Sequence, residues 1–377
     1  MSIKTNFYKL LYKIIFNIKY KIHIEWNDFN KNRKDAYYLL ANHPSLNDGI
    51  LQSLYLKKQP TMVVDHLELS NPKWKHILTN VVKSIEVHRE LFNIKSIHEI
   101  KDQIDKNKAI FMFPEKSASY FGENHLLPLS TAKLIKKYPL DIAMVKSQGS
   151  YLANPRWGEK IPFRANIDLD YQMILTKERI KILSIEEIHN ILVDHLAYND
   201  FQWNKEQKYL YRNKHRALGL EKYIYFCPKC SKHQTIYTKG ESIYCEHCGK
   251  LGHFNAYLLL SGFEFDDLMT WDKLQKQALP QILSNSIFTR GSMSLLNMDD
   301  DSIKELNYMD MEINPKSKAV FVQNRDDEIM FEIKKIKRLS LLRKDELVFE
   351  YKGIIYAFKI EDPILMKDSL EYIKKQD

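Results

Sequence analysis

The sequence predicts an α/β layered domain, followed by a ribbon around four cysteines and a small β-rich C-terminal domain. Short apolar runs alternate with amphipathic segments from residue 21 to about residue 176, the pattern of strands and helices stacked in layers. Two Cys-x-x-Cys pairs follow, and beyond residue 319 the pattern changes to short alternating strands that end in a helix. We therefore divide the chain into residues 1–24, 25–220, 221–260, 261–316 and 317–377.

The composition is that of a globular protein with room for two or three domains. The chain has 377 residues, of which 44% are hydrophobic and 28% charged. An excess of 57 Lys and Arg over 48 Asp and Glu gives a net charge of +9, which favours anionic partners such as a phospholipid surface, a phosphate-bearing substrate or nucleic acid. No apolar stretch is long enough to predict a transmembrane helix. Lysines interrupt the N-terminal apolar residues, so no secretory signal is predicted.

Residues 1–24 predict a basic amphipathic helix. Five lysines precede the first acidic residue, Glu25. Apolar residues recur at helical spacing and form one face: Phe7, Leu10, Leu11, Ile14, Ile15, Ile18 and Ile22. Such a helix can lie in the headgroup layer of a membrane, with its lysines toward anionic phosphates. The alternative is that the apolar face packs against the core of the protein itself.

Residues 25–220 predict alternating strands and helices. The expected strands are 22–26, 36–41, 60–64, 84–87, 109–113, 140–146 and 165–169. The expected helices are 48–56, 74–82, 94–106 and 130–137, followed by a charged helical stretch at 184–220.

A histidine and an aspartate follow the second of these strands. His43 comes after strand 36–41 and Asn42, and Asp48 stands five positions further on. Ligands of α/β sheets bind at strand ends. A carboxylate that folds back can hold one imidazole nitrogen while the other faces substrate, as a general base requires. In a chain with 13 histidines the pair also arises by chance, so a structural histidine is the alternative.

Polar residues close three further strands. Arg89 follows strand 84–87, where a guanidinium can bind a phosphate with two hydrogen bonds. A carboxylate, an ammonium and a hydroxyl leave strand 109–113 in the run Phe113-Pro114-Glu115-Lys116-Ser117, and Arg156 lies in the segment after strand 140–146. Each residue alone also fits a solvated side chain or a surface ion pair. Their shared position at strand ends points to one site.

These blocks resemble, in sequence and order, those of the glycerolipid acyltransferases, the family that includes bacterial lysophosphatidate acyltransferase. The resemblance covers residues 36–160 and implies an O-acyltransferase of phospholipid synthesis. It would move a fatty acyl group from acyl-ACP, acyl-CoA or acyl phosphate to the hydroxyl of a lysophospholipid. The resemblance implies His43 as general base and Asp48 as its orienting partner. The implied substrate-binding residues are Asn42, Ser45, Arg89, Pro114, Glu115, Lys116, Ser117 and Arg156.

The third block departs from the family pattern. The usual run is Phe-Pro-Glu-Gly-Thr-Arg-Ser, whereas here Lys116 replaces the glycine and Ala118 the arginine. One expected phosphate contact is therefore missing, and either Lys116 or Arg156 would have to supply it. The change leaves open a lysophospholipid acceptor other than lysophosphatidate. A serine nucleophile at Ser45 or Ser117 is a further alternative, but the chain has no Gly-x-Ser-x-Gly elbow.

The two Cys-x-x-Cys pairs are the most specific local signal. Cys227 and Cys230 are separated by 14 residues from Cys245 and Cys248, and these are all 4 cysteines of the chain. The spacing predicts a structural zinc ion held by four thiolates, with Gly249 allowing the second turn around the metal. Two disulfides are the alternative, although a chain without a predicted signal peptide is expected in a reducing compartment. Residues 128–157 also resemble a bacterial acyltransferase subgroup that carries a zinc ribbon.

A zinc ribbon in a basic chain also suggests a nucleic-acid-binding protein, which we keep as the alternative function. Acidic residues near the ribbon oppose contact with a phosphate backbone, so we expect no nucleic-acid partner: Glu241, Glu246, Glu264, Asp266 and Asp267. The expected partners are an acyl donor, a lysophospholipid and a membrane surface. We expect a cytoplasmic protein, peripheral on the inner face of the cell membrane.

The C-terminal third predicts a helical connector and then a β domain. A helix at 271–283, capped by Thr270, and a polar stretch through residue 314 make up the connector 261–316. Strands are expected at 319–323, 328–333, 340–342, 347–351 and 354–360, and a final helix at 363–374. Several short antiparallel strands closed by one helix resemble a pleckstrin-homology-like domain.

Overall fold

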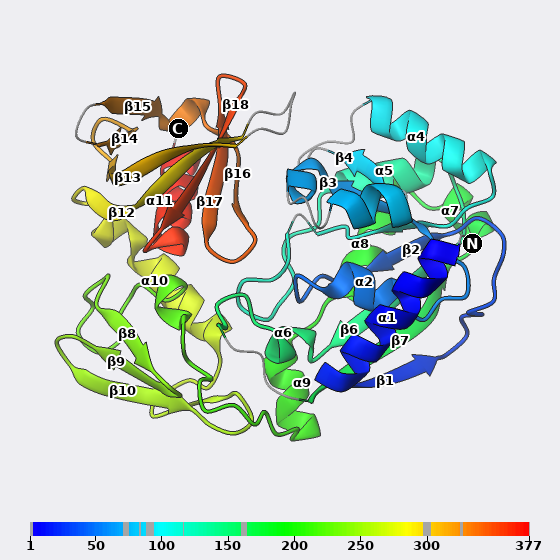
Figure 1. The fold of residues 1–377 in the computed structure, drawn as a ribbon, viewed down its shortest axis with the longest axis horizontal. Helices are drawn as coiled ribbons and strands as arrows, with labels where there is room; N and C mark the ends of the chain where they lie inside the picture. The colour runs from blue at the N-terminus through cyan, green and yellow to red at the C-terminus, as the bar shows by residue number, and fades with distance from the viewer. Residues whose placement is uncertain are drawn as a thin grey trace. The chain divides into compact units, whose positions relative to one another are not determined.

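The computed structural model describes residues 3–70, 75–82, 84–87, 94–115, 117–159, 164–296, 303–324 and 327–376 (Figure 1). The chain divides into two compact units. Unit 1 comprises Met1–Pro155 and Ile161–Arg212, and unit 2 comprises Arg156–Lys160 and Asn213–Asp377.

Unit 1 is built on a seven-stranded sheet with the strand order β1-β7-β6-β2-β5-β3-β4. The neighbours β6, β2, β5, β3 and β4 run parallel, so their carboxyl ends meet at one edge of the sheet. Strand β7 runs antiparallel to β6, and β1 pairs with β7 in parallel. The strands are β1 (Tyr20–Trp26), β2 (Tyr38–Ala41), β3 (Thr61–Asp65), β4 (Ile85–Val87), β5 (Ile110–Met112), β6 (Ile142–Gln148) and β7 (Ala165–Leu175).

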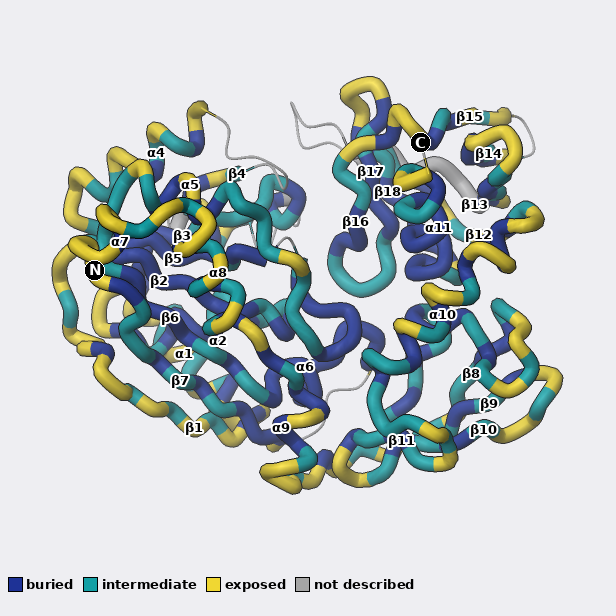
Figure 2. Tube along the Cα trace, turned by 180° about the vertical axis from the view of Figure 1, so that it is seen from behind, coloured by how far each residue is buried: buried dark blue, intermediate teal, exposed yellow. Residues whose placement is uncertain are grey.

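Helices cover both faces of this sheet. One face packs against α4 (Ile94–Asp105), α5 (Leu129–Lys137), α7 (Lys177–Ile182) and α8 (Ile185–Leu196). Tyr38 and Leu40 of β2 point to this face, and Leu39 and Ala41 point to the other because side chains alternate along a strand. All four are fully buried, and β2 is dark blue in Figure 2. Burial on both faces explains why the parallel strands are continuous apolar runs in the sequence.

The opposite face carries α1 (Ile3–Lys19) and α2 (Asp48–Ser53) (Figure 1). The helix expected to reach residue 24 ends at Lys19. From Tyr20 onward the chain pairs with β7, and this pairing outweighs the helical pattern of the sequence. The remaining short elements of unit 1 are η1 (His66–Ser70), η2 (Ile77–Val82), α6 (Ser150–Ala153) and α9 (Asp200–Gln207).

Unit 2 begins with a four-stranded antiparallel ribbon in the order β11-β10-β9-β8. It follows η3 (Leu220–Lys222) and consists of β8 (Ile236–Lys239), β9 (Ser242–Cys245), β10 (Gly249–Phe254) and β11 (Leu260–Ser261). Before the first cysteine pair and after it, Phe226 and His233 form one isolated antiparallel bridge.

A second seven-stranded sheet forms the C-terminal part of unit 2, in the order β15-β14-β13-β12-β18-β17-β16. Each described strand pair is antiparallel. The strands are β12 (Ile287–Leu296), β13 (Ile303–Asn314), β14 (Ala319–Gln323), β15 (Glu328–Glu332), β16 (Lys337–Leu342), β17 (Glu346–Tyr351) and β18 (Ile354–Ile360). The helical elements are α10 (Leu268–Ile282), η4 (Ile333–Lys335) and α11 (Pro363–Lys375).

The expected connector 261–316 is wrong in its second half, because β12 and β13 belong to the sheet. Several exposed side chains on these strands are polar, namely Arg290, Ser292 and Asp310, which weakens the apolar alternation, although Phe288 is also exposed. The helix start is also corrected: Asp267 caps α10, accepting a hydrogen bond of 2.7 Å from the backbone N–H of Thr270. The expected fold class is confirmed as an α/β domain, a four-cysteine ribbon and an antiparallel C-terminal β domain. None of the described helices is long and apolar enough to span a bilayer.

Candidate functional site

The site lies at the edge of the unit 1 sheet where the parallel strands end. Asn42 and His43 follow β2, and Phe113 and Glu115 follow the neighbouring strand β5. The His43 ring stacks on the Phe113 ring, with centroids 4.0 Å apart and planes inclined by 11°. This stacking and the strand end fix the imidazole at the mouth of the site, where 19% of its side chain is exposed.

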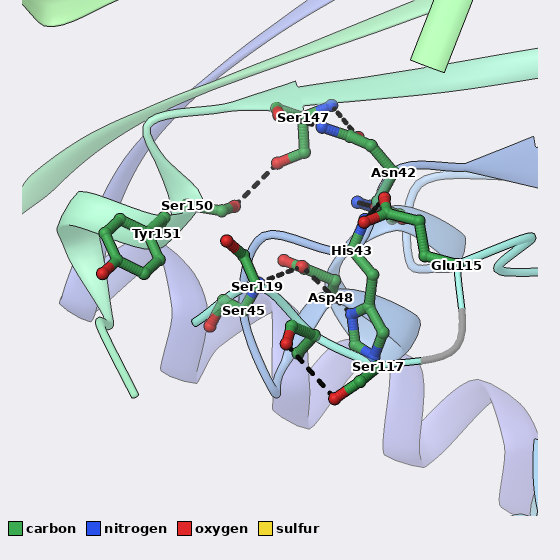
Figure 3. A network of polar contacts seen from close by, with 12 residues as sticks. Asn42, His43, Ser45, Asp48, Glu115, Ser117, Ser119, Ser147, Ser150 and Tyr151 are labelled. Atoms are coloured by element: carbon green, nitrogen blue, oxygen red, sulfur yellow. Dashed lines mark hydrogen bonds and ion pairs between the residues drawn. The ribbon is translucent and has the colours of Figure 1, made fainter. Parts of the chain in front are cut away.

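Asp48 lies against the imidazole from the first turn of α2. Its Oδ2 is 3.5 Å from His43 Nδ1 and accepts a 2.5 Å hydrogen bond from the backbone N–H of Ser45 (Figure 3). The carboxylate is fully buried, and burial raises its pKa well above the usual value. The Ser45 N–H and the Ser150 hydroxyl oppose that rise because both favour the ionised form. The pairing places His43 Nε2 on the side of the ring away from Asp48.

Glu115 connects two loops of the site. One carboxylate oxygen accepts from the backbone N–H of His43 and the other from that of His125, each at 2.9 Å. Burial raises the pKa of Glu115 to about 8, while the two N–H donors lower it and the nearby charge of Asp48 raises it further. Both carboxylate oxygens therefore accept hydrogen bonds from the backbone. Through these bonds Glu115 holds the loop that carries the His43 imidazole in place.

A second set of polar residues closes the site from β6. The Asn42 amide makes two 2.7 Å hydrogen bonds with the main chain of Ser147, one to its carbonyl and one from its N–H. The Ser147 hydroxyl lies 2.7 Å from that of Ser150. The Ser45 hydroxyl is bonded to the Asn154 carbonyl at 3.3 Å and to its amide at 3.0 Å. Asn42, Ser45, Ser147 and Ser150 are all buried.

Sequence reasoning gave no role to Ser147, Ser150 and Asn154 of this network, or to Ser119, whose backbone N–H donates to the His43 carbonyl at 2.9 Å. No motif marks them. Their one signal is position, since Ser147 is the last residue but one of β6 and the polar segment after that strand belongs to the same sheet edge.

The structure brings together most of the expected substrate residues. Pro114 is buried beside Glu115, and the Ser117 side chain lies next to the His43 ring (Figure 3). Arg89 and Lys116 lie outside the described residues. Arg156 belongs to unit 2, where its buried guanidinium donates to the backbone carbonyls of Leu341 and Arg343.

The four cysteines of unit 2 form a compact cluster. All four Sγ atoms lie within 4.8 Å of one another, and the Cys227–Cys248 and Cys230–Cys245 pairs are 3.9 and 3.8 Å apart. A tetrahedral zinc ion with bonds of about 2.3 Å places its sulfur ligands about 3.8 Å apart, whereas a disulfide requires about 2.0 Å. The cluster therefore fits a metal ion and not disulfides. Gly249 follows the second pair with a φ of 69°, as the tight turn requires.

Comparison with known proteins finds matches among solved structures. No protein-family model and no curated protein matches the chain. Among solved structures, it matches the 1-acyl-sn-glycerophosphate (LPA) acyltransferase PlsC from Thermotoga maritima, with 14% identity and a TM-score of 0.44. The match covers 54% of this chain and 80% of that chain. A likeness at this level assigns neither a substrate nor a reaction to the present protein.

Proposed function

We propose that the protein is an O-acyltransferase that moves a fatty acyl group to the hydroxyl of a lysophospholipid. One observation supports this proposal most strongly. The imidazole of His43, at the end of a parallel strand, faces a buried carboxylate at Nδ1 and is partly exposed. A base supported in this way removes a proton from an alcohol. The acyl donor and the lysophospholipid acceptor in this proposal come from the resemblance of the sequence blocks to those of the glycerolipid acyltransferases.

In the proposed reaction the acceptor oxygen attacks the acyl carbonyl carbon while His43 Nε2 takes the hydroxyl proton. The bond from that carbon to the thioester sulfur, or to the phosphate oxygen of an acyl phosphate, then breaks. The leaving thiolate or phosphate receives the proton from His43. Asp48 holds the Nδ1–H tautomer and stabilises the transient imidazolium, so no covalent acyl-enzyme is needed.

A serine nucleophile is less well supported. Ser45 is 2% exposed, and its hydroxyl donates to the backbone carbonyl of Asn154 and accepts from the side-chain NH2 of the same residue. It belongs to the framework of the site. Ser117 lies beside His43 on a loop without the elbow geometry of serine hydrolases. In the proposal Arg89, Lys116 and Ser117 bind the acceptor headgroup.

An acyl-transfer assay tests the proposal. The purified protein is offered acyl-CoA, acyl-ACP or acyl phosphate together with lysophosphatidate or other lysophospholipids, in the presence of vesicles. We expect a diacyl product from at least one pair, and none from an acceptor whose free hydroxyl has been replaced by hydrogen. Consumption of donor that yields only free fatty acid with every acceptor would contradict acyl transfer.

We further propose that α1 lies on a membrane surface. An apolar stripe of this helix faces solvent and consists of Phe7 (63% exposed), Leu10 (60%), Leu11 (40%), Ile14 (51%) and Ile18 (59%). The buried side of the helix is less apolar: Thr5 and Phe16 are buried, and Lys9 donates to the Leu56 carbonyl at 2.6 Å. Because the apolar stripe is exposed to solvent, its transfer into the headgroup layer of a bilayer is favourable. The positive net charge of the chain favours a bilayer with anionic lipids.

Ile14→Asp is expected to abolish most binding to phosphatidylglycerol vesicles without lowering stability, because this side chain is half exposed in the folded chain. Vesicle flotation and the melting temperature measure the two effects. Ile182→Asp is the matched control, since Ile182 is 85% exposed at the end of α7 and lies outside the stripe. Equal flotation of the two variants would rule out the stripe as the contact surface.

We also propose that the four thiolates of unit 2 hold zinc with a structural role. The donor set and the sulfur spacing support this ion, and four thiolates leave no coordination position for a substrate.

A further inference from the structure

The main chain of His43 is held at both ends by the segment that follows β5. Its backbone N–H donates to Glu115 Oε1 at 2.9 Å, and its carbonyl accepts from the backbone N–H of Ser119 at 2.9 Å. Glu115 and Ser119 are both buried, so water competes little for these hydrogen bonds. The position of the imidazole therefore depends on the conformation of the 117–125 loop as well as on the loop that contains His43.

The Ser119 hydroxyl closes a turn inside the 117–125 loop. It accepts from the backbone N–H of Gly122 at 2.9 Å and donates to the Glu123 carbonyl at 2.6 Å. A hydroxyl that bonds backbone groups three and four residues ahead in this way fixes the main chain of a turn. Because Ser119 also supplies the N–H for the His43 carbonyl, the turn sets the direction of that N–H.

The far side of this turn is fixed to α9. The φ of Gly122 is 94°, and a Cβ there would lie 2.8 Å from the Phe201 ring, so only glycine fits the turn at this distance. The Gly122 carbonyl accepts from the Asp200 N–H at 3.0 Å, and the Tyr198 hydroxyl donates to the Glu123 carbonyl at 3.2 Å. The turn is thus braced by the Ser119 hydroxyl on one side and by a helix on the other.

We propose that Ser119 is a positioning residue for His43: its hydroxyl fixes the turn at 119–123, and the turn directs the Ser119 N–H at the His43 carbonyl. The ring is then kept stacked on Phe113 and beside Asp48. A displacement of about 1 Å at a reacting group can lower a rate about a hundredfold, so the turn is expected to affect the rate. The inference rests on the proposed function only for this effect, since the hydrogen bond to the His43 carbonyl has its own readout.

Two variants separate the hydrogen bonds of Ser119 from its packing. Ser119→Ala removes the hydroxyl, and Ser119→Cys fills the volume with a thiol, which is a weak donor and a weak acceptor. We expect kcat of acyl transfer to fall about tenfold in both variants. KM should stay unchanged, because the Ser119 side chain is fully buried and is not exposed to a substrate.

Ser53→Ala is the matched control. This buried hydroxyl donates to the Gly49 and Ile50 carbonyls within α2, and its removal should leave kcat at the wild-type value.

The sequence allows the His43 carbonyl to be observed by itself. His43-Pro44 is the one His-Pro pair in the chain. Protein labelled with ¹³C-carbonyl histidine and ¹⁵N-proline therefore gives a single carbonyl–nitrogen correlation in an NMR spectrum. We expect this carbonyl signal to move upfield in both Ser119 variants, because a carbonyl carbon is shielded when its hydrogen bond weakens. In Ser53→Ala the signal should stay in place.

A second labelling scheme observes the two amides that Glu115 holds. Asn42-His43 and Asn124-His125 are the two Asn-His pairs of the chain, so ¹³C-carbonyl asparagine with ¹⁵N-histidine gives one amide signal for each. Both signals should keep their wild-type positions in the Ser119 variants, because the Glu115 carboxylate still accepts from both N–H groups.

An unmoved His43 carbonyl signal in both Ser119 variants would overturn the inference, whatever the activity. Wild-type kcat and carbonyl signal in Ser119→Cys would also overturn it, because lost packing would then explain Ser119→Ala. A raised KM together with displaced amide signals would mean a general loosening of the loop and would contradict a positioning role. If wild type transfers no acyl group but the carbonyl signal moves as expected, the proposed function fails and the link from the turn to His43 stands.

Discussion

His43→Ala is expected to lower acyl transfer by about a hundredfold to ten-thousandfold, the range for loss of a general base. The base that takes the acceptor proton is then gone, while Asp48, Glu115 and the loop remain. Stability should change little, since the ring lies at the mouth of the site, stacked on Phe113, and is outside the central core of the sheet. Initial rates with saturating acceptor and the melting temperature measure the two effects.

The matched control is His98→Ala, which removes an exposed imidazole from α4 in the same unit. It should retain wild-type rates. If the acyl-transfer rate of His43→Ala were within tenfold of the wild-type rate, His43 would not be the general base. A structural role for this histidine at the strand end would then be favoured.

The parallel strands were predictable because each is a short apolar run buried on both faces. All seven expected strands of unit 1 are present, with ends shifted by a few residues in most cases. The pairing of His43 with Asp48 was predictable for a local reason: both stand in one loop, five positions apart. Strand ends marked the site, since the carboxyl ends of parallel strands share an edge.

The supporting network was not predictable because it joins distant positions. Asn42 meets Ser147 across 105 residues, Ser45 meets Asn154 across 109, and Tyr151 meets Asp200 across 49. Serine and asparagine at loop positions carry no periodic signal. The orientation of α1 was also beyond the sequence, because amphipathicity identifies a stripe and does not say which side packs inward. In β12 and β13 exposed polar residues such as Arg290, Ser292 and Asp310 concealed the strand pattern.

Removing zinc is expected to unfold the ribbon and to destabilise unit 2 as a whole. Structural zinc contributes about 10 kcal/mol or more to folding in isolated fingers at neutral pH. The Phe226 carbonyl accepts from the Trp271 indole of α10 at 2.9 Å, and Gln234 donates to the Phe288 carbonyl at 2.8 Å and to Asp362 at 2.9 Å. When the ribbon unfolds, these hydrogen bonds break, so α10 and the C-terminal sheet are destabilised as well.

A loss of even about 5 kcal/mol in a unit of this size lowers the melting temperature by about 10–20 °C. Calorimetry of Cys245→Ser, and of wild type treated with a chelator, should show this decrease in the transition of unit 2, with metal analysis giving one zinc per wild-type chain. His247→Ala is the matched control, because this exposed imidazole lies between Cys245 and Cys248 but is not part of the sulfur cluster.

The outcome separates zinc binding by these four residues from the formation of two disulfides. With a structural zinc site, the thermal unfolding temperature of unit 2 depends on zinc. The proposed acyl transfer by His43 in unit 1 is measured in a separate assay. Two disulfides would appear as a mass lower by four hydrogens and a transition sensitive to reductant and not to chelator. Wild type that melts at an unchanged temperature after complete loss of zinc would contradict the structural role, since the Phe226 and Gln234 contacts would then hold without the metal.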